Sequence, residues 1–463
     1  MFRTLPALAT LGVLAASLAA DPPATPADRR VEGAAYNLGI LGARGKRVAD
    51  GAAPAIELAE VDKGGSLDRA GLAVGDRVVM VDGAALPTDQ DPFYVVAAAL
   101  EKRLRVKGEQ RLPLVAMRGL EKLVFNASVM GLGPDWAGAM RRASAEMLAT
   151  KLLTKDGCYE TTYNSNDSKV AVASMAGLAM IAMGGSAKGD YSAGLRAIRG
   201  YVVEKAGVED MKPGAPGANT NQVNWSLGFG TLFLSEWIAG REDKGALRRL
   251  GELCAAIEAN QEPNGGWAHG PGGPNRLGYT DFAAVTALVL AGYGAAGQVK
   301  APVKAAVVER GIAYLAGTAG AGGAIGYSQR DGQKGMEEPG RAGAALVAFA
   351  LNRQGKHALV PAIGTFLGDH LAGLPEGHAS PMFHIAFGAL GASTAGRYPA
   401  FAKLYAYELL LARNADGTFF PRPSPESASG ANSDPPMGKA WPTAAYLLAW
   451  SLERSGLNLA GRK

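Results

Sequence analysis

The chain has 463 residues, of which 48% are hydrophobic and 19% are charged, so it can bury a sizeable core and is not disordered by composition. Its 47 Lys and Arg residues against 42 Asp and Glu residues give a formal net charge of +5. The basic residues are scattered, without a Lys/Arg run or a basic patch interleaved with aromatics, which argues against nucleic acid as a partner. The length predicts about two or three domains.

The first residues have the pattern of an export signal. Arg3 supplies a positive charge, residues 5–18 a short apolar segment, and Ser17-Leu18-Ala19-Ala20 a small-residue cleavage site. The alternative is a membrane anchor, but the apolar run is shorter than the ~20 residues that a spanning helix needs. We therefore predict a signal peptide at residues 1–20 and a linker at residues 21–30. The protein is expected to be exported, in the periplasm, the cell envelope or the medium, with no stable membrane anchor.

The next part of the chain, residues 31–128, predicts a small β-rich (α+β) domain. Asp91 is a suitable N-cap for a helix at residues 92–105, and Pro92 suits its first turn. Strand-like runs stand at residues 55–61, 77–81, 111–117 and 123–128.

Two segments of this domain resemble those of PDZ domains. Asn37-Leu38-Gly39-Ile40 is similar to their carboxylate-binding loop. Residues 70–83, from Ala70-Gly71-Leu72 to Val81-Asp82-Gly83, match the signature of PDZ domains in bacterial envelope proteases. The resemblance covers almost the whole domain and implies a PDZ-like fold.

The same resemblance implies a groove for a peptide or a protein C-terminus. Successive backbone N–H groups of the loop would hold the carboxylate, and the peptide would add to the sheet as a strand. Arg44 would supplement the carboxylate site or occupy it. The alternative is a closed loop in a domain that only docks on its neighbour. The residues expected to bind the peptide are Leu38, Gly39, Ile40, Arg44, Phe93 and Val96.

From residue 134 to 459 the chain alternates apolar stretches of helical period with glycine-bearing loops. Six such loops recur at a spacing of roughly fifty residues, long enough for two helices and two turns. The second helix of most pairs is apolar on every face and is expected to form an inner wall, whereas the first carries charges and belongs outside. The expected fold is an (α/α)6 toroid of about six helix pairs. Its helices are predicted at 136–153, 168–184, 190–206, 222–240, 244–261, 280–296, 300–316, 339–354, 358–373, 380–393, 397–413 and 439–455.

This region resembles the terpenoid-cyclase and protein-prenyltransferase superfamily of toroids. Gln261-Glu262-Pro263-Asn264-Gly265-Gly266-Trp267 fits the Q-x3-G-x-W repeat of squalene cyclases, which is structural in that family. The catalytic motifs of the superfamily are missing: there is no D-x-D-D acid motif, no prenyltransferase zinc site and no Cys-Gly-Glu-Gln thioester. The resemblance implies the fold and excludes cyclase and prenyltransferase chemistry.

The order of export signal, PDZ-like domain and toroid also resembles an uncharacterised family of exported bacterial proteins. Tyr36-Asn37-Leu38-Gly39 followed by Gly42-Ala43-Arg44-Gly45 is the stretch that carries this likeness. It implies architecture and location and no activity.

Metal and cofactor chemistry has no motif in the sequence. The five His residues form no pair with the spacing of a zinc enzyme, and neither a P-loop nor a G-x-S-x-G elbow occurs. We therefore predict no metal and no cofactor. Cys158 and Cys254 are too few for a disulfide framework, and both alternatives stay open: a bond between them, or two buried thiols.

If each loop joins an outer helix to an inner one, all inner helices run the same way and their amino ends meet at one mouth of the ring. Each helix end carries roughly half a positive charge, so the mouth favours polar or anionic ligands. Capping alone explains many polar residues there. The candidate catalytic residues are Asp281, Tyr279, His384, Arg341 and Glu337.

Two enzyme hypotheses use this mouth. A glycoside hydrolase would pair Asp281 with Glu337, Glu338 or Asp167 across the sugar. A polysaccharide lyase would use Tyr279 or His384 as the base, with Asn224 and Arg341 to orient and neutralise a uronate. Stacking surfaces for sugar rings would come from Trp225, Trp267 and Trp441.

The sequence thus predicts an exported binding protein of two domains. The PDZ-like groove would take a peptide or a protein C-terminus, and the toroid mouth would hold a polar ligand or partner. The alternative is a carbohydrate-active enzyme, a polysaccharide lyase or a glycoside hydrolase, that acts on a polar or anionic polysaccharide at that mouth.

Overall fold

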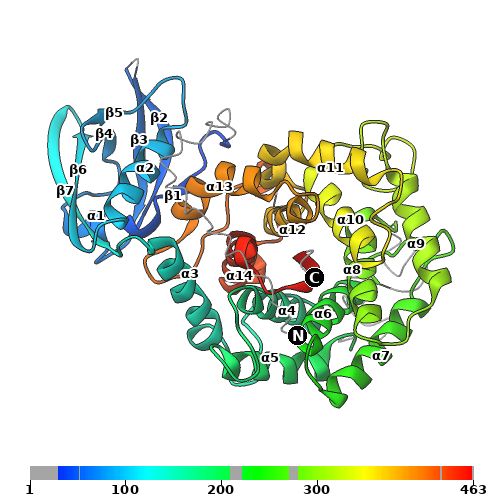
Figure 1. Cartoon of the computed structure of the whole chain (residues 1–463). Helices are drawn as coiled ribbons and strands as arrows, with labels where there is room; N and C mark the ends of the chain where they lie inside the picture. The colour runs from blue at the N-terminus through cyan, green and yellow to red at the C-terminus, as the bar shows by residue number, and fades with distance from the viewer. Residues whose placement is uncertain (1–29, 52, 209–221, 271–279, 428–429, 461–463) are drawn as a thin grey trace, which may run out of the picture.

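The computed structural model of the chain describes residues 30–51, 53–208, 222–270, 280–427 and 430–460. The predicted signal peptide lies outside the described residues, and so does Pro213-Gly214, which is one of the six glycine-bearing loops of the predicted repeat. Within the described residues, an antiparallel sheet region is followed by a helical region (Figure 1). No helix of these residues combines the length and the apolarity that a membrane crossing requires.

The sheet region is one antiparallel sheet with two helices. Its strands run in the order β1-β2-β3-β4-β6-β7, and β5 pairs with β4 alone. Helix α2 (Pro92–Leu104) begins at Asp91, whose carboxylate accepts a hydrogen bond of 3.0 Å from the Phe93 N–H, and its apolar side fills the core of the sheet. The other elements are β1 (Tyr36–Asn37), β2 (Ala43–Asp50), β3 (Ala53–Val61), α1 (Ser66–Arg69), β4 (Arg77–Val81), β5 (Ala84–Ala85), β6 (Gly108–Arg118) and β7 (Glu121–Gly131).

The helical region has two concentric layers. The outer layer contains α3 (Trp136–Glu146), which continues as a π-helical turn (Met147–Lys151), and α5 (Ser192–Lys205), α7 (Lys244–Ala259), α9 (Ala305–Thr318), α11 (Val360–Asp369) and α13 (Tyr398–Ala412). The inner layer contains α4 (Asn166–Ala182), α6 (Val223–Ile238), α8 (Ala283–Gln298), α10 (Pro339–Leu351), α12 (Pro381–Thr394) and α14 (Ala440–Ser451). Each inner helix packs against the next, and α14 packs against α4, so the ring is closed (Figure 1).

The inner helices are parallel, as predicted. At every step around the ring, a residue at or just before the start of one inner helix is hydrogen-bonded to a residue at the start of the neighbouring inner helix or in the loop that precedes it. These contacts gather the six amino ends at one mouth. They join Asp167 to the Gln222 N–H (3.3 Å), His269 O to Asn224 N (3.0 Å), Tyr327 O to Ala283 N (2.8 Å), Glu338 to His378 N (2.8 Å), Asp434 to Met382 N (3.1 Å) and Pro436 O to Thr162 N (2.7 Å).

Aromatic rings close the axis below this mouth. Phe229 of α6 contacts Phe387 of α12, on the opposite side of the ring, with 6.2 Å between the ring centroids. Trp441 of α14 approaches Phe229 at 5.8 Å, and Trp225 approaches Phe383 at 5.5 Å. These rings meet across the axis, so the described residues leave no open channel there, and we call this mouth with its aromatic floor the basin.

Both cysteines lie in the packed interior of the protein. Cys158 and Cys254 are both free and buried, which settles the alternative in favour of two separate thiols. Burial raises the pKa of Cys254 to about 12.

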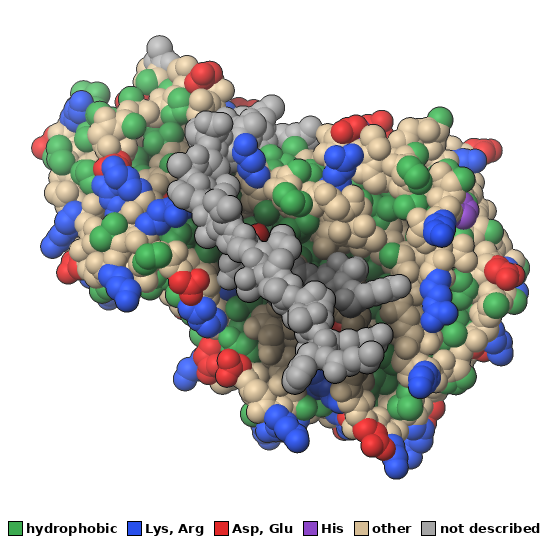
Figure 2. All heavy atoms as spheres, in the orientation of Figure 1, with side chains coloured by type: hydrophobic (Ala, Val, Ile, Leu, Met, Phe, Trp, Pro, Cys, Tyr) green, Lys and Arg blue, Asp and Glu red, His purple; other side chains and the backbone are tan. Residues whose placement is uncertain are grey.

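On the face in Figure 2, Lys and Arg side chains are interspersed with Asp and Glu and do not gather in one basic patch.

Candidate functional site

The loop that resembles a carboxylate site is already occupied by the chain itself. The Leu38 N–H donates to Ala43 O at 2.9 Å, and the Asn37 side-chain amide donates to Ala412 O at 3.1 Å. A Cβ placed on Gly39 would lie 3.1 Å from Leu410 O, so the backbone of α13 lies directly against the loop. A peptide carboxylate has no room between the loop and α13.

The predicted side-chain pocket is filled as well. Phe93 and Val96 are buried in the core of the sheet region. The Arg30 guanidinium lies 4.3 Å from the centre of the Phe93 ring. Arg44 forms an ion pair with Glu60 and lies over the ring of Phe420, 4.5 Å from its centre, so it contacts the helical region. Ile40 is half-buried in the same covered loop. The predicted peptide groove is therefore wrong, because the helical region and Arg30 fill it.

What joins the two regions is a buried group of four charges. Arg30 pairs with Asp91 at 2.6 Å and lies 3.7 Å from Glu408 of α13, and Arg422 pairs with Glu408 at 2.8 Å. All four side chains are less than 10% exposed. Two cations thus face two anions at the junction. This arrangement agrees with the alternative to peptide binding, in which the loop is closed and the domain only docks on its neighbour.

At the mouth of the ring, His378 and Glu426 form an accessible pair. Nδ1 of His378 lies 2.5 Å from Oε1 of Glu426, and the Ala379 N–H donates to Oε2 at 2.7 Å. The two side chains are 48% and 28% exposed, so solvent reaches both. Burial would raise the pKa of Glu426, but the hydrogen bonds from His378 and Ala379 outweigh it and lower the pKa.

Behind this pair lies a buried cluster of Glu338, Arg341 and His384. Oε1 of Glu338 accepts the His378 N–H at 2.8 Å and lies 2.8 Å from Nε2 of His384. Arg341 is ion-paired with Glu338, and it also donates to Ile325 O at 3.0 Å and to Met336 O at 3.2 Å. Every nitrogen of this guanidinium is thus committed within the protein.

His384 is held in a slot that only glycine neighbours allow. A Cβ on Gly340 would lie 2.1 Å from Nδ1 of His384, and a Cβ on Gly377 would lie 2.2 Å from the ring. Burial, with the nearby charge of Arg341, lowers the pKa of His384 to about 4, so the ring is neutral at pH 7. Its Nε2 faces His378 O at 3.0 Å, which assigns the proton to that nitrogen.

Asp434 ties the starts of α12 and α14 together. Its carboxylate accepts hydrogen bonds from the Ser380 hydroxyl (2.5 Å), the Met382 N–H (3.1 Å) and the Trp441 indole (2.8 Å). The residue is fully buried, and this burial raises its pKa to about 6.

A row of aromatic side chains borders the basin beside His378. Tyr327 approaches His378 at 5.7 Å and stacks on Phe282, with 5.3 Å between centroids and 6° between planes. The Trp225 indole donates to Nδ1 of His269 at 2.9 Å. Burial lowers the pKa of His269 to about 4, so the neutral ring can accept this bond. Trp225 and Tyr327 are half-buried and keep part of their surface toward solvent.

The structure brings together only some of the candidates that the sequence selected. Arg341 and His384 meet at Glu338, and Glu337 beside them is exposed. Asp281 accepts from the Asn264 side chain at 3.0 Å, within the loop between α7 and α8, and no described contact links it to Glu338. Tyr279 lies outside the described residues.

The other polar and aromatic candidates have structural roles. Asp167 accepts the Gln222 N–H, and Asn224 donates to Ala268 O at 2.8 Å. Trp267 is fully buried, and its indole donates to Ile257 O at 2.8 Å. Asp167 and Asn224 thus hold neighbouring helix starts together, and Trp267 is anchored to the end of α7, so none of the three is available as a sugar-binding surface.

No sequence motif indicates Glu426 or its pairing with His378. Glu426 lies in the Pro- and Ser-rich segment between α13 and α14, 48 residues after His378. The one signal for it was the length of that segment, since a long loop before the last inner helix can reach over the mouth. Among the described residues, no group of three or more His, Cys, Asp or Glu side chains is arranged to hold a metal ion.

Comparison with known proteins gives a family. The model of a domain of unknown function, DUF6288, matches residues 157–461, so the chain belongs to this family. A search of curated proteins finds no match.

Two solved structures are similar in shape. An inactive variant of the α-1,6-mannanase of Salegentibacter, in complex with α-1,6-mannotriose, is 12% identical with a TM-score of 0.47, covering 68% of this chain and 99% of that one. The unsaturated glucuronyl hydrolase of Bacillus sp. GL1 is 13% identical with a TM-score of 0.46, covering 69% and 96%. Both are enzymes that act on sugars. Neither is a PDZ protein or a cyclase. The filled groove shows that the predicted peptide-binding protein is wrong.

Proposed function

We propose that the protein is a carbohydrate-active enzyme, and more narrowly a glycoside hydrolase, with its site in the basin at the amino ends of the inner helices. The observation that carries the proposal is the His378–Glu426 pair. It is a carboxylate and an imidazole in contact and exposed to solvent, whereas the ion pair of Glu338 and Arg341 behind it is buried.

The chemistry of this pair suits glycoside hydrolysis. Hydrolysis requires a group that takes a proton from water and a group that gives a proton to the departing sugar oxygen. The lowered pKa of Glu426 keeps its carboxylate ionised at pH 7, and the contact with His378 Nδ1 places an exchangeable proton beside it. Glu338, held by Arg341 and His384, fixes the backbone of His378 and so orients the pair.

The state of Arg341 favours a hydrolase over a lyase. A lyase acting on a uronate needs a cation free to neutralise the sugar carboxylate. Arg341 is 3% exposed and is bound to Glu338 and to two backbone carbonyls. His384 is 3% exposed and faces Gly340 and Gly377, so it does not reach a substrate as a base.

The proposed ligand is a polar polysaccharide or oligosaccharide. The partly exposed faces of Trp225 and Tyr327 offer apolar surface for a sugar ring beside the His378–Glu426 pair. The six helix amino ends around the basin favour hydroxyl-rich or anionic groups.

The finer fold class and the location belong to the same proposal. We assign the two helical layers to the (α/α)6 toroids and expect the domain boundaries at residues 31–128 and 134–459. Export by the signal at residues 1–20 is also part of the proposal. Mass spectrometry of the protein from the periplasm and the medium should show a new amino terminus near Asp21, whereas an intact Met1 on cytoplasmic protein would refute export.

The test of function is a screen of neutral and acidic polysaccharides with reducing ends measured as product. We expect turnover by the wild type on at least one glycan, and a loss of at least about a hundredfold in Glu426→Gln, the size expected for removing an acid–base group. Glu309→Gln, which removes the same charge from the exposed surface of α9, is the matched control and should keep full activity.

The same screen can refute the proposed site or the proposed class of function. If Glu426→Gln keeps the wild-type rate on a glycan that the wild type cleaves, the pair is not the catalytic group. If no glycan in the screen is cleaved or bound, the proposed class of function is wrong.

A further inference from the structure

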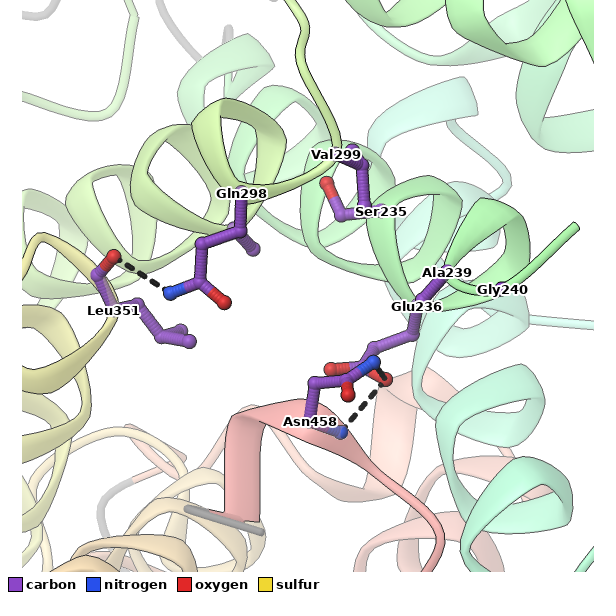
Figure 3. Close-up of a pocket in the computed structure, with 9 residues that line it drawn as sticks. Ser235, Glu236, Ala239, Gly240, Gln298, Val299, Leu351 and Asn458 are labelled. Atoms are coloured by element: carbon purple, nitrogen blue, oxygen red, sulfur yellow. Dashed lines mark hydrogen bonds between the residues drawn. The ribbon is translucent and has the colours of Figure 1, made fainter. Parts of the chain in front are cut away.

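A second cavity lies at the opposite mouth of the ring, where the inner helices end. It has a volume of about 200 Å³ and is partly open to solvent. The carboxyl ends of α6, α8 and α10 surround it, with the segment near Asn458 on the remaining side (Figure 3). Its lining residues are Ser235, Glu236, Ala239, Gly240, Ala295, Gln298, Val299, Leu351 and Asn458.

The lining of this cavity is negative. Three parallel helices end at it, and each carboxyl end carries roughly half a negative charge. Glu236 adds a carboxylate that is only 5% exposed. None of the described residues that line the cavity is Lys, Arg or His.

Within the part of the chain that the structure describes, Glu236 has hydrogen-bond partners but no ion pair. Its oxygens accept from the N–H groups of Asn458 (3.0 Å) and Leu459 (2.8 Å) and from the Asn458 side chain (3.3 Å), which are all neutral donors. A buried carboxylate without a cation is costly, and burial indeed raises the pKa of Glu236. A cation in the cavity would relieve that cost.

Gln298 presents a second acceptor to the same space. Its Nε2 donates to Leu351 O at 2.9 Å, which leaves its side-chain oxygen directed away from that carbonyl. Figure 3 shows this oxygen and the Glu236 carboxylate turned toward the open space between the helices. Leu351, Val299 and Ala295 supply apolar wall around the two acceptors.

We propose that this cavity binds a small organic cation with a primary ammonium group. The ammonium would donate to Glu236 and Gln298, and a short carbon chain would lie against the apolar wall. The site is separate from the basin of the proposed hydrolase, since it lies at the other end of the same helices. The competing explanation is that Glu236 only anchors the segment at Asn458 and Leu459.

The probe is putrescine, with butanediol as the uncharged molecule of the same length. Calorimetry and thermal unfolding of the full chain should detect putrescine binding and no butanediol binding over the same concentrations. Glu236→Gln keeps the shape and removes the charge, and we expect it to weaken putrescine binding at least about tenfold, because hydrogen bonds to charged groups are the stronger class. Glu309→Gln should bind like the wild type.

A second variant separates binding from anchoring. Ala239→Leu fills the rim of the cavity without touching the bonds of Glu236, and it should abolish putrescine binding while the unfolding temperature stays near that of the wild type. The proposal is overturned if putrescine does not bind, if butanediol binds equally, or if Ala239→Leu binds as the wild type does. Should Glu236→Gln fail to fold, the Ala239→Leu result alone decides.

Discussion

Glu408 offers the sharpest test of how the two regions of the chain are joined. In the structure it faces Arg422 at 2.8 Å and Arg30 at 3.7 Å, and its side chain is 7% exposed. Glu408→Leu would remove one of the two anions that face the buried Arg30 and Arg422 guanidinium groups within the described residues and would leave Asp91. Removing one partner of a buried ion pair costs about 3–5 kcal/mol, because the remaining charge stays buried without compensation.

The matched control is an ion pair on the surface of the same molecule. Glu101 pairs with Arg105 along α2, with side chains 24% and 54% exposed. Glu101→Leu removes the same charge, but exposed pairs contribute only about 0–1 kcal/mol. The double variant Glu408→Leu with Arg422→Leu should recover part of the loss, since both charges then leave the interior together.

The assay is urea unfolding followed by tryptophan fluorescence and circular dichroism. We expect the midpoint of Glu408→Leu to fall well below those of the wild type and Glu101→Leu, with partial recovery in the double variant. Equal midpoints for Glu408→Leu and Glu101→Leu would refute the role of this buried group in joining the two regions.

Three further predictions concern Gly340, Gly39 and the carboxylate of Asp434. Gly340→Ala would place a Cβ 2.1 Å from His384 Nδ1 and should lower the free energy of unfolding by more than about 2 kcal/mol. The control is Gly200→Ala in α5, which has open space around it and should raise the free energy of unfolding by up to about 1 kcal/mol. Equal effects of the two variants in chemical denaturation would contradict the tight packing of His384 against Gly340. Gly39→Ala should cost about 1–2 kcal/mol, because φ is +68° there and Leu410 O is close; an unchanged unfolding midpoint would contradict the packing of α13 on this loop. Asp434 has a folded pKa of about 6, above its ordinary value of about 3.9, so its contribution to stability is full below about pH 4 and is lost as pH rises through about 6, by roughly 3 kcal/mol. Asp434→Asn should remove that part of the pH dependence, and identical pH profiles of unfolding for both proteins would refute it.

Much of the helical region could be predicted because its signal is local. An inner helix such as α8 is apolar on every face, and the loops between helices carry glycines such as Gly265 and Gly417 at positive φ. Because outer and inner helices alternate along the chain, the sequence alone also predicts that all inner helices run in the same direction. In the sheet region, β2 was missed, because its charged residues Arg44, Lys46 and Arg47 give a strand no apolar alternation.

The site could not be predicted to the same degree, because its contacts join distant parts of the chain. The residues that cover the loop at Gly39 lie about 370 positions later, at Leu410 and Ala412, and no local pattern indicates them. Asp281 and Phe282 are adjacent, yet Phe282 packs on Tyr327 at the basin while Asp281 bonds Asn264 in its own loop. A residue type at a helix start therefore does not tell whether the side chain enters the basin.

The measurement that tests the central claim most directly is cleavage of a glycan in water enriched in heavy oxygen. Hydrolysis at the His378–Glu426 pair predicts a product with one heavy oxygen at its new reducing end, formed by the wild type and by Glu309→Gln and not by Glu426→Gln. An unsaturated product without label would show lyase chemistry, and labelled product from Glu426→Gln at the wild-type rate would place the chemistry elsewhere. Either outcome would contradict the proposed site.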